Sequence, residues 1–441
     1  MMNKLRVLTA ITRACLLLVV MAVVLAACAP AATSTPPPTK AAPPPAATAT
    51  TAPSKVEATK PAEKPAGTAT PPAAAKATGK PIRIPLIAPF TGPGGTFGNS
   101  FKFGALVAQD DLNASGGIGG YPLEIALTDD QMAPKEAVTV MRTAAEKDKA
   151  VAILGPMAQA PVDVAIPIAN ELQVPMITYA FRFAGSPPYK PWVFRIGPSD
   201  DVEANLMLAA LKKVYPQVKK VLIVGDVKEK ATEYWTKSIF PQSIRQAGLN
   251  LIDTVAFESG TTDFGAIVTK IKDLAPDAIA YAGGAASNPV GFANELVRQG
   301  VKVPVTTPHF FAMGGFVERS GGAMDGWVFG WSLDPNRPDL KDIVARFMTK
   351  AKGDSSAPPG YRPMLDFSVY DTVMMLAKVM RDAKITPDTD VQKARALIAD
   401  GMRGLKSFNG LMGNITMNEN QDADWEPAVL IVKNGSLASL Q

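Results

Sequence analysis

The stretch "PFTGPGGTFGNS" occupies residues 89–100 and lies between two segments of different character. The apolar run "IRIPLIA" before it is typical of a buried strand, and residues 100–113 after it are typical of a helix. Strand, glycine-rich loop and helix is the layout of a phosphate-binding site, but the spacing argues against a nucleotide. A dinucleotide fingerprint would need glycine where Phe97 stands, and the Gly-Lys-Ser/Thr triplet of a P-loop is missing from the chain.

From residue 81 onward, short apolar runs alternate with helical segments. Strands are predicted at "IRIPLIA", "LEIALT", "AVAIL" and "VPMIT", and the pattern restarts after residue 200 with "KKVLIVGD", "LNLIDTVAF" and "PDAIAYAGG". Helices are predicted near residues 100–113, 134–147, 160–172, 201–213, 230–247, 264–274 and 288–300. This alternation predicts parallel sheets built from βαβ units. Near-continuous apolar strands indicate cover on both faces, so we expect an α/β protein with two Rossmann-like lobes.

The last part of the chain continues the helical pattern and then changes character. Helices are predicted near residues 341–352, 365–382 and 390–400, followed by a hairpin within "NGLMGNITMNENQDADWEPAVLIV". A tail that returns after two α/β halves can complete both of them. We therefore expect discontinuous lobes, with lobe 1 formed by residues 81–199 and 328–400 and lobe 2 by residues 200–327 and 401–441.

Residues 1–27 are predicted to be a signal peptide rather than part of the fold. Lys4, Arg6 and Arg13 form a positive segment before and at the start of the apolar stretch "ACLLLVVMAVVLAA". The following "LAAC" resembles a bacterial lipobox, which places the cut before Cys28 and a lipid on its thiol. The alternative is an uncleaved anchor helix, although the apolar stretch is short for a stable membrane span. Both interpretations export the chain and tether it to the outer face of the cytoplasmic membrane.

Residues 28–80 are dominated by Ala, Pro and Thr, as in "AATSTPPPTKAAPPPAATAT". Val56 is their one large aliphatic residue, so this segment cannot bury enough apolar surface to offset its ordering entropy. We expect a disordered tether that its prolines keep extended. The two cysteines of the chain are Cys15 and Cys28, so the mature domain has no thiol for a disulfide, a metal site or a nucleophile.

Composition and motifs argue against nucleic-acid binding and catalysis. The net charge of +5 is small for 441 residues, and no basic stripe with interleaved aromatic residues occurs. The chain lacks a G-x-S-x-G elbow and an H-E-x-x-H motif, so we predict no catalytic residue, cofactor or metal site. We expect the one histidine, His309, either to line a cleft or to make an ordinary hydrogen bond in a loop. The adjacent Asp129 and Asp130 suit helix capping before Pro134 better than paired acid–base chemistry.

Longer motifs along residues 81–435 resemble one protein family. The opening "PLIAPFTGPGGTFGNSFKFGALVAQDDLNASGGIGGYPLEIALTDDQMAPKEAV" is similar to the start of the periplasmic branched-chain amino acid (Leu/Ile/Val) type of ABC-transporter substrate-binding protein. The family's later landmarks resemble, in order, "VPMITYA", "VFRIGPSD", "TTDFGAIVTKIKDLAPDAIAYAGG", "FSVYDTVMMLAKVM" and "FNGLMGNITMN". The resemblance implies the type I periplasmic binding fold, in which two lobes joined by three hinge crossovers close on a small solute and pass it to a membrane permease.

The resemblance also implies which positions meet the ligand. In typical members, hydroxyl groups hold the ligand carboxylate where Gln159 and Arg182 stand here, and a glutamate near the position of Asn288 pairs with the ligand ammonium. Lys230 stands where an aromatic ring normally faces the ligand, whereas the ring of the opening loop is retained as Phe97. The predicted ligand-binding residues are Phe97, Met157, Gln159, Tyr179, Ala180, Arg182, Lys230, Asn288 and Phe310.

These departures from the family's pattern predict a different ligand. A free ammonium in a closed cleft needs an anionic partner, because an unpaired buried charge costs several kcal/mol. Asn288 cannot supply that charge, whereas Arg182 and Lys230 would favour an anion. We expect a carboxylate, an amide or an aromatic acid rather than a simple zwitterionic amino acid. The alternative is that Arg182 and Lys230 point to solvent and that the matched loop positions are shifted by a residue or two.

The sequence therefore predicts a lipid-anchored, extracytoplasmic solute-binding protein of an ABC importer. It would act as a monomer through hinge closure rather than chemistry, because its ligand stabilises the closed state. Its expected partners are the small solute, the transmembrane permease subunits and the membrane that holds the lipid. One alternative is a sensor of the same fold that reports a solute to a signalling partner, and another is an exported enzyme.

Overall fold

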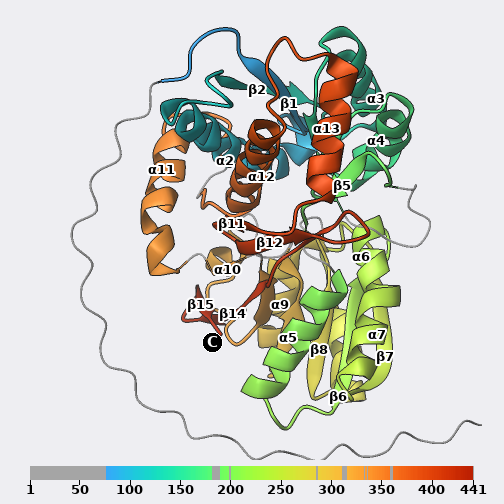
Figure 1. The fold of residues 1–441 in the computed structure, drawn as a ribbon. Helices are drawn as coiled ribbons and strands as arrows, with labels where there is room; N and C mark the ends of the chain where they lie inside the picture. The colour runs from blue at the N-terminus through green and yellow to red at the C-terminus, as the bar shows by residue number, and fades with distance from the viewer. Residues whose placement is uncertain are drawn as a thin grey trace, which may run out of the picture. The chain divides into compact units, whose positions relative to one another are not determined.

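The structure is a computed structural model that describes residues 76–180, 189–197, 200–284, 287–309, 315–331, 333–334, 336–357 and 361–440. These residues lie in one compact unit, Thr70–Gln441. Two β-sheets flanked by helices dominate it, as Figure 1 shows. The α/β class expected from the alternating pattern is confirmed.

The first sheet is parallel and has the strand order β2-β1-β3-β4-β5. Its strands are β1 (Ile82–Ala88), β2 (Leu123–Asp129), β3 (Ile153–Leu154), β4 (Met176–Thr178) and β5 (Val193–Arg195). Parallel neighbours cannot be joined by a tight hairpin, and helices form the crossovers between β1, β2, β3 and β4. The carboxyl ends of all these strands consequently lie along the same edge of the sheet.

Helices cover both faces of the first sheet, as its apolar strands predicted. One face packs against α2 (Gly95–Ala114), α11 (Lys341–Ala351), α12 (Leu365–Asp382) and α13 (Val391–Arg403), and the other against α3 (Pro134–Arg142) and α4 (Gln159–Glu171). The period of two along β1 divides its side chains between these two cores. Leu86 and Ala88 belong to the core beneath α2 and α12, whereas Ile87 belongs to the core beneath α3 and α4.

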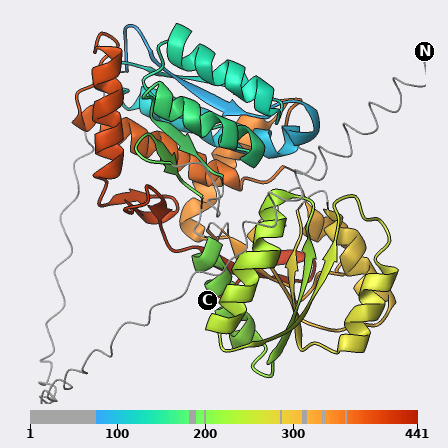
Figure 2. The ribbon, with the colours of Figure 1, turned by 90° about the vertical axis from the view of Figure 1, so that its right-hand side faces the viewer.

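The second sheet has the order β15-β14-β10-β9-β8-β6-β7, and it is parallel from β7 to β10. Its strands are β6 (Lys220–Asp226), β7 (Asn250–Phe257), β8 (Ala278–Ala282), β9 (Val305–Thr307), β10 (Val328–Trp331), β14 (Ala428–Lys433) and β15 (Ser436–Ser439), the last two being antiparallel additions. Its helices are α5 (Asp200–Val214), α6 (Lys230–Tyr234), α7 (Phe240–Gln246), α8 (Gly265–Leu274), α9 (Pro289–Arg298) and α10 (Phe316–Arg319). Figure 2 shows helices on both sides of this sheet.

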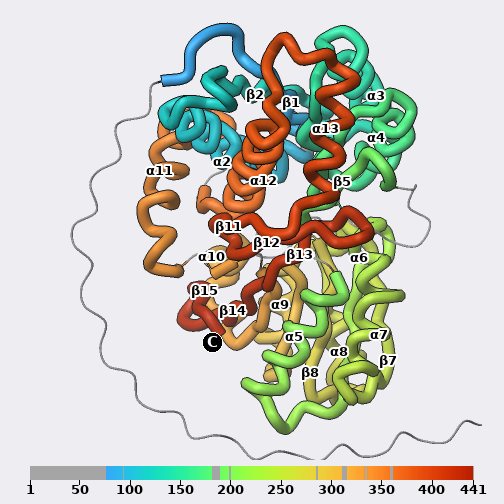
Figure 3. Tube along the Cα trace, viewed as in Figure 1, coloured from blue at the N-terminus to red at the C-terminus, as the bar shows by residue number. Residues whose placement is uncertain are grey.

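Along the described residues the chain passes between the two sheets three times, after β5, after β10 and before β14. The third passage follows a small antiparallel sheet of β11 (Phe408–Gly410), β12 (Gly413–Met417) and β13 (Ala423–Asp424), and Figure 3 traces the chain from β13 into β14. The small sheet packs on the core of the first sheet through residues such as Met412 and Ile415.

The strand pairing differs from the expected lobe boundaries at two places. Residues 328–331 form β10, which pairs with β9 and β14 in the second sheet, whereas the sequence assigned them to lobe 1. Residues 405–425 contribute to the core of the first sheet, whereas the sequence assigned them to lobe 2. The physical reason is burial: the short run "WVFGW" is apolar throughout and fills an interior position between two strands that come from distant parts of the chain.

The glycine-rich opening differs from its prediction because the helix begins earlier. A 3-10 turn occupies Gly92–Gly94 and α2 begins at Gly95, so Phe97 lies in the first turns of the helix rather than in a loop. Gly98 lies directly against the backbone of Pro89, where a Cβ would overlap the carbonyl oxygen. The glycine is therefore required for close approach between the helix and the end of β1.

Asp129 secures this opening segment instead of capping the next helix. Its carboxylate accepts hydrogen bonds from the backbone N–H of Phe90 (2.8 Å) and from the hydroxyl of Thr91. Ala133 occupies the N-cap position of α3 and no side chain caps it, so the capping role expected for the two aspartates was wrong. Burial tends to raise the pKa of Asp129, but the hydrogen bonds from Thr91, Gln131 and Phe90 outweigh it and lower this pKa.

Candidate functional site

The predicted ligand-binding residues that the structure describes follow the carboxyl ends of strands. Parallel strands place these ends at one edge of a sheet, which is where open α/β sheets bind ligands. Phe97 follows β1, Met157 and Gln159 follow β3, and Tyr179 and Ala180 follow β4. In the second sheet, Lys230 follows β6 and Asn288 follows β8. The sheet topology thus gathers residues that are far apart in sequence.

The loops after β3 and β4 are held together by Thr178. Its buried hydroxyl donates to the carbonyl oxygen of Pro156 (2.6 Å) and accepts from the backbone N–H of Ala180 (3.2 Å). Met157, Tyr179 and Ala180 next to these contacts are almost completely buried. Their positions are therefore fixed by packing and by the hydrogen bonds of Thr178.

A run of aromatic rings links the opening of α2 to the end of β9. Phe97 contacts Phe101 edge-on with ring centroids 5.1 Å apart, and Phe101 contacts Tyr179 in the same way at 5.6 Å. Tyr179 then contacts the ring of His309 edge-on at 6.0 Å. Edge-on contacts suit the charge distribution of aromatic rings. Because His309 follows β9 of the second sheet, this run joins the carboxyl edges of the two sheets.

Lys230 makes a second connection between the two sets of residues. Its ammonium lies 2.7 Å from a carboxylate oxygen of Asp163 on α4, and the other oxygen of Asp163 accepts a hydrogen bond from Gln159 at 2.9 Å. The side chain of Lys230 is 55% exposed, so the free energy of this ion pair is small. The positive charge predicted to meet an anionic ligand therefore already has a carboxylate beside it.

Asn288 has a structural role that its sequence position did not reveal. It is the N-cap of α9, and its side-chain oxygen accepts a hydrogen bond from the backbone N–H of Gly291 at 3.1 Å. Its backbone is left-handed, with φ of 48°, a conformation that asparagine tolerates better than most residues. Three other predicted residues, Arg182, Phe310 and the lipidation site Cys28, lie outside the described residues.

A cluster of buried charges lies where the chain passes between the sheets, and the sequence analysis did not find it. Arg195 at the end of β5 is 3% exposed. Its Nε lies 3.1 Å from Oδ1 of Asp422, and its Nη1 lies 3.8 Å from Oδ2 of Asp200. The indole N–H of Trp235 also donates to Asp200, at 3.2 Å. The cluster thus connects the first passage between the sheets to the segment before β13.

His309 and Glu203 extend this cluster to the aromatic run. One carboxylate oxygen of Glu203 accepts the backbone N–H of His309 at 2.8 Å, and the other lies 2.7 Å from the ring Nδ1. One of the two roles expected for His309 was an ordinary hydrogen bond in a loop. The observed contact is stronger than that, because both side chains are almost completely buried. Glu203 also approaches Gly330 so closely that a Cβ there would overlap it.

Burial and pairing act against each other in the protonation of this cluster. Burial raises the pKa of Asp200 to about 7, although Arg195 opposes the shift. Burial would lower the pKa of His309, but the adjacent Glu203 outweighs it and the net change is upward. Near neutral pH, Asp200 therefore keeps its proton for part of the time, and His309 holds its proton to a higher pH than a free imidazole does.

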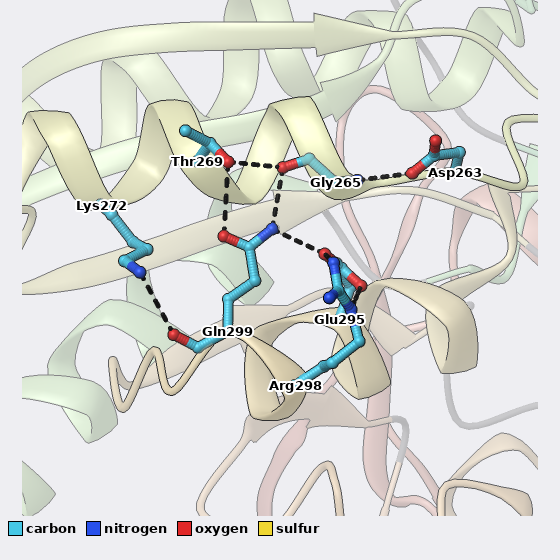
Figure 4. Close-up of polar contacts among 7 residues, drawn as sticks. All are labelled: Asp263, Gly265, Thr269, Lys272, Glu295, Arg298 and Gln299. Atoms are coloured by element: carbon cyan, nitrogen blue, oxygen red, sulfur yellow. Dashed lines mark hydrogen bonds and ion pairs between the residues drawn. The ribbon is translucent and has the colours of Figure 1, made fainter.

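A contrasting polar network lies on the surface between α8 and α9, and Figure 4 shows its members. Gln299 donates to the carbonyl oxygen of Gly265 (2.9 Å) and to Glu295 (2.6 Å), and Lys272 reaches the carbonyl oxygen of Gln299 (3.4 Å). Arg298 lies 2.5 Å from Glu295. Hydrogen bonds from Arg298 and Gln299 lower the pKa of Glu295 to about 2. This network joins two helices at the surface, whereas the side chains of the cluster around Arg195 are buried.

Metal ligands and cavities do not point to another site. Across the described ranges, no group of three or more His, Cys, Asp or Glu side chains is placed to hold a metal ion. A cavity of about 450 Å³ lies at the end of α11, and its lining includes Met348, Lys352 and Tyr361 but none of the predicted ligand-binding residues. No helix among the residues that the structure describes is long and apolar enough to cross a membrane.

The missed residues carried only weak sequence signals. Asp200 and Glu203 stand in the first turn of α5, where acidic residues are common for electrostatic reasons. Arg195 stands in "VFRIGPSD", a landmark of the resemblance without an assigned role. The contacts of Arg195 with Asp422 and of Glu203 with His309 join residues 227 and 106 positions apart, so no local pattern could have revealed them.

Comparison with known proteins gives one consistent match. A model described as periplasmic binding protein matches residues 81–432 of the chain. An amino acid binding protein of Pseudomonas aeruginosa is 26% identical over 285 residues, which cover 60% of this chain and 70% of the relative.

Solved structures show the same fold. A leucine-binding protein from Thermotoga maritima is 26% identical with a TM-score of 0.68, and the match covers 82% of this chain and 98% of that protein. A solute-binding protein of an ABC transporter from R. palustris, solved with benzoate, is 19% identical with a TM-score of 0.66 and matches 82% of this chain and 96% of its own. At that identity the second likeness concerns the fold alone.

Proposed function

Since the chain belongs to the periplasmic binding protein family, we propose that it is the solute-binding component of an ABC importer and delivers a small carboxylate-bearing solute to a membrane permease. Membership of this family also makes it a binding protein rather than an enzyme. The observation that carries the proposal is the match over residues 81–432, which includes the first sheet, the second sheet up to β14 and the three passages described between them.

The geometry supports a ligand between the carboxyl edges of the two sheets. Phe97, Met157, Gln159, Tyr179 and Ala180 would meet it from the first sheet. Lys230 and Asn288, with Arg182 and Phe310, would complete the site from the loops identified by the sequence. A ligand that contacts both sheets binds the closed state more tightly than the open state, and this difference in affinity drives closure.

The class of ligand follows from charge and from the relatives together. The Pseudomonas relative is named for amino acids and the Thermotoga structure for leucine, whereas the R. palustris structure holds benzoate. A carboxylate is common to all of these ligands. Asn288 replaces the expected anionic partner of an ammonium, and this favours an aromatic or aliphatic carboxylate over a zwitterion. Because Lys230 is paired with Asp163, its charge attracts an anionic ligand less strongly. The neutral Asn288 near the position of the family's glutamate still disfavours an ammonium.

A binding panel on the purified protein tests the ligand class. Thermal shift and then calorimetry would compare leucine, isoleucine, benzoate, 3,4-dihydroxybenzoate and short amides. We expect saturable binding of a carboxylate that lacks an α-ammonium, with a higher melting temperature because ligand binds only the folded state. Strong stabilisation by leucine without any response to benzoate would contradict the preference for acids. Absence of saturable binding to the whole panel would contradict the solute-binding proposal for these classes.

We further propose that the protein is exported and anchored through a lipid on Cys28, with residues 28–80 as the tether. The lipobox-like "LAAC" after an apolar stretch supports this proposal. In the native host, Cys28→Ser should release the protein from membranes or leave it as an uncleaved precursor. Cys15→Ser is the matched control, because Cys15 lies inside the proposed signal peptide, and it should leave processing unchanged. Normal processing and membrane retention of Cys28→Ser would rule out the lipid anchor.

A further inference from the structure

The strongest unassigned feature is the double contact between Glu203 and His309. One oxygen of the carboxylate binds the backbone N–H of His309 and the other binds its ring, at 2.8 Å and 2.7 Å. The two side chains are 1% and 4% exposed. A carboxylate that holds both the main chain and the ring of one residue fixes the position of the residue and the orientation of its imidazole.

The orientation of this imidazole matters because of the residue that it contacts. The His309 ring lies edge-on to Tyr179, with planes 83° apart. Tyr179 in turn contacts Phe101, whose ring contacts Phe97. Tyr179 and Phe97 are two of the residues proposed to meet the ligand from the first sheet. Glu203 therefore acts on the proposed site through His309, although it reaches no ligand position itself.

We propose that Glu203 and His309 are positioning residues of the solute site, and that protonated His309, held by Glu203, keeps the Tyr179 ring in its ligand-binding position. This inference rests on the proposed solute-binding function. It assigns a role to the one histidine of the chain, and it predicts that the affinity for a solute depends on the proton carried by His309.

The surroundings of His309 explain why it carries that proton. Among the described residues, Glu203 makes no hydrogen bond with any side chain other than His309. If the imidazole were neutral, the buried carboxylate of Glu203 would lose its charged hydrogen-bonding partner, which is strongly unfavourable. Within the described ranges, Asp200 from the start of α5 also favours the proton, and Arg195 from β5 opposes it. The net effect raises the pKa of His309 above its ordinary value.

The sign of the dependence follows directly. Because this pKa is raised, His309 is protonated below about pH 6.5, and full affinity is expected there. Affinity should then fall as the pH rises through the pKa of folded His309. Asp200, with a pKa of about 7, titrates in a similar range and must be separated from His309 by experiment.

The test uses the full chain, with benzoate and leucine as probes. Because the chain has one histidine, NMR of the imidazole gives a single titration that needs no assignment. We expect the dissociation constant of a bound probe to rise about tenfold between pH 6 and pH 9, comparable with the loss of one modest buried contact. Its midpoint should coincide with that of the imidazole. Glu203→Gln should move both midpoints to lower pH, whereas Asp200→Asn should leave them linked to each other.

Glu295→Gln is the matched control, because it removes a paired carboxylate from the surface network of Figure 4, and it should change neither midpoint. Affinity that stays constant while the imidazole titrates would overturn the positioning role and leave the solute-binding function intact. If neither probe binds, the proposed ligand class is wrong, and the NMR signals of the Tyr179 ring then test the positioning role. Signals of Tyr179, identified with Tyr179→Phe, must then shift with the imidazole midpoint, and static signals would overturn it. Both wild-type titrations remain informative if Glu203→Gln does not fold.

Discussion

The buried cluster around Arg195 and the surface network between α8 and α9 contain the same kinds of groups in opposite surroundings. In the surface network, Glu295 pairs with Arg298, whose side chain is 69% exposed, and the pKa of Glu295 is lowered to about 2 because hydrogen bonds outweigh desolvation. In the buried cluster, Asp200 faces Arg195, and yet its pKa is raised to about 7 because burial dominates. Pairing alone therefore does not set the protonation of a carboxyl group, because the solvent around the pair decides whether desolvation or pairing is the larger effect.

The largest expected effect comes from removing the buried cation. Arg195→Met would leave the carboxylate of Asp422 in the interior without its partner at 3.1 Å. We expect a loss of about 3–5 kcal/mol in the free energy of unfolding, as for other broken buried pairs. Urea denaturation at pH 7 measures it, with Arg298→Met from the surface network as the control. A loss equal to that of the control would show that the interior cluster is hydrated like a surface.

The pH dependence of stability should distinguish the two regions next. The raised pKa of His309 stabilises the fold fully below about pH 6.5, and this contribution is lost as the pH rises through the folded value. Folded Asp200 also binds its proton more tightly than the unfolded chain does, so its contribution to stability decreases as the pH rises from the ordinary pKa of 3.8 to the folded value of about 7. Asp366 belongs to neither region, but it is buried at the start of α12, and burial raises its pKa to about 7, so it adds to this effect.

We therefore expect the free energy of unfolding to fall between pH 5 and pH 8. The pKa of Glu295 is lowered, so its contribution is lost only as the pH falls through about 2. Chemical denaturation across this range gives the curve, and Asp200→Asn should flatten it. A stability that rises from pH 5 to pH 8 would contradict the protonation states assigned to the buried cluster.

The ion pair between Lys230 and Asp163 is an intermediate case with a smaller expected effect. It joins α4, which flanks the first sheet, to α6, which flanks the second, but the side chain of Lys230 is 55% exposed. We expect Lys230→Gln to cost at most about 1 kcal/mol, with the difference disappearing at high salt. Because the charge already has Asp163 beside it, the affinity for benzoate should change less than about threefold, which corresponds to under 1 kcal/mol. A much larger loss of affinity would mean that Lys230 leaves Asp163 and supplies its charge to the ligand carboxylate, as the sequence predicted.

The smallest effect is expected within the surface network. Glu295→Gln keeps the hydrogen-bonding shape of the side chain and removes a charge that water already screens. The melting temperature at pH 7 should remain within experimental error of the wild type. Lys272→Gln, which tests the more distant contact with the carbonyl oxygen of Gln299, should behave in the same way. A clear drop for either variant would show that α8 and α9 depend on these exposed contacts.

Most of the fold could be predicted because its signals are local. The strands of both parallel sheets and the helices between them follow from runs of apolar residues and from helical periodicity. The predicted helix near residues 264–274, for example, is observed as α8 (Gly265–Leu274). The start of α2 and the capping near Asp129 were wrong. Both involve tertiary contacts with the segment just after β1, through Gly98 and through Asp129, and cannot be derived from propensity.

The candidate site was only partly predictable for the same reason. Phe97 and Tyr179 follow the carboxyl ends of β1 and β4, which is where open α/β sheets bind ligands, and their contact with a ligand stays a prediction. This rule could not show that Asn288 is committed to capping α9, or that Lys230 has a carboxylate beside it. Residue type gives the chemistry that a side chain can perform. Its neighbours in space determine whether that chemistry is free for a ligand.

The sequence by itself determined the α/β class, the two successive halves and the family resemblance, because each depends on the order of short motifs along the chain. Only the tertiary structure decided that β10 lies in the second sheet, that Arg195 is shared by Asp200 and Asp422, and that Glu203 holds His309 against the aromatic run. The physical reason is that burial and charge pairing are properties of neighbours in space. Glu203 and His309 are 106 positions apart along the chain, and they meet because α5 and β9 pack together.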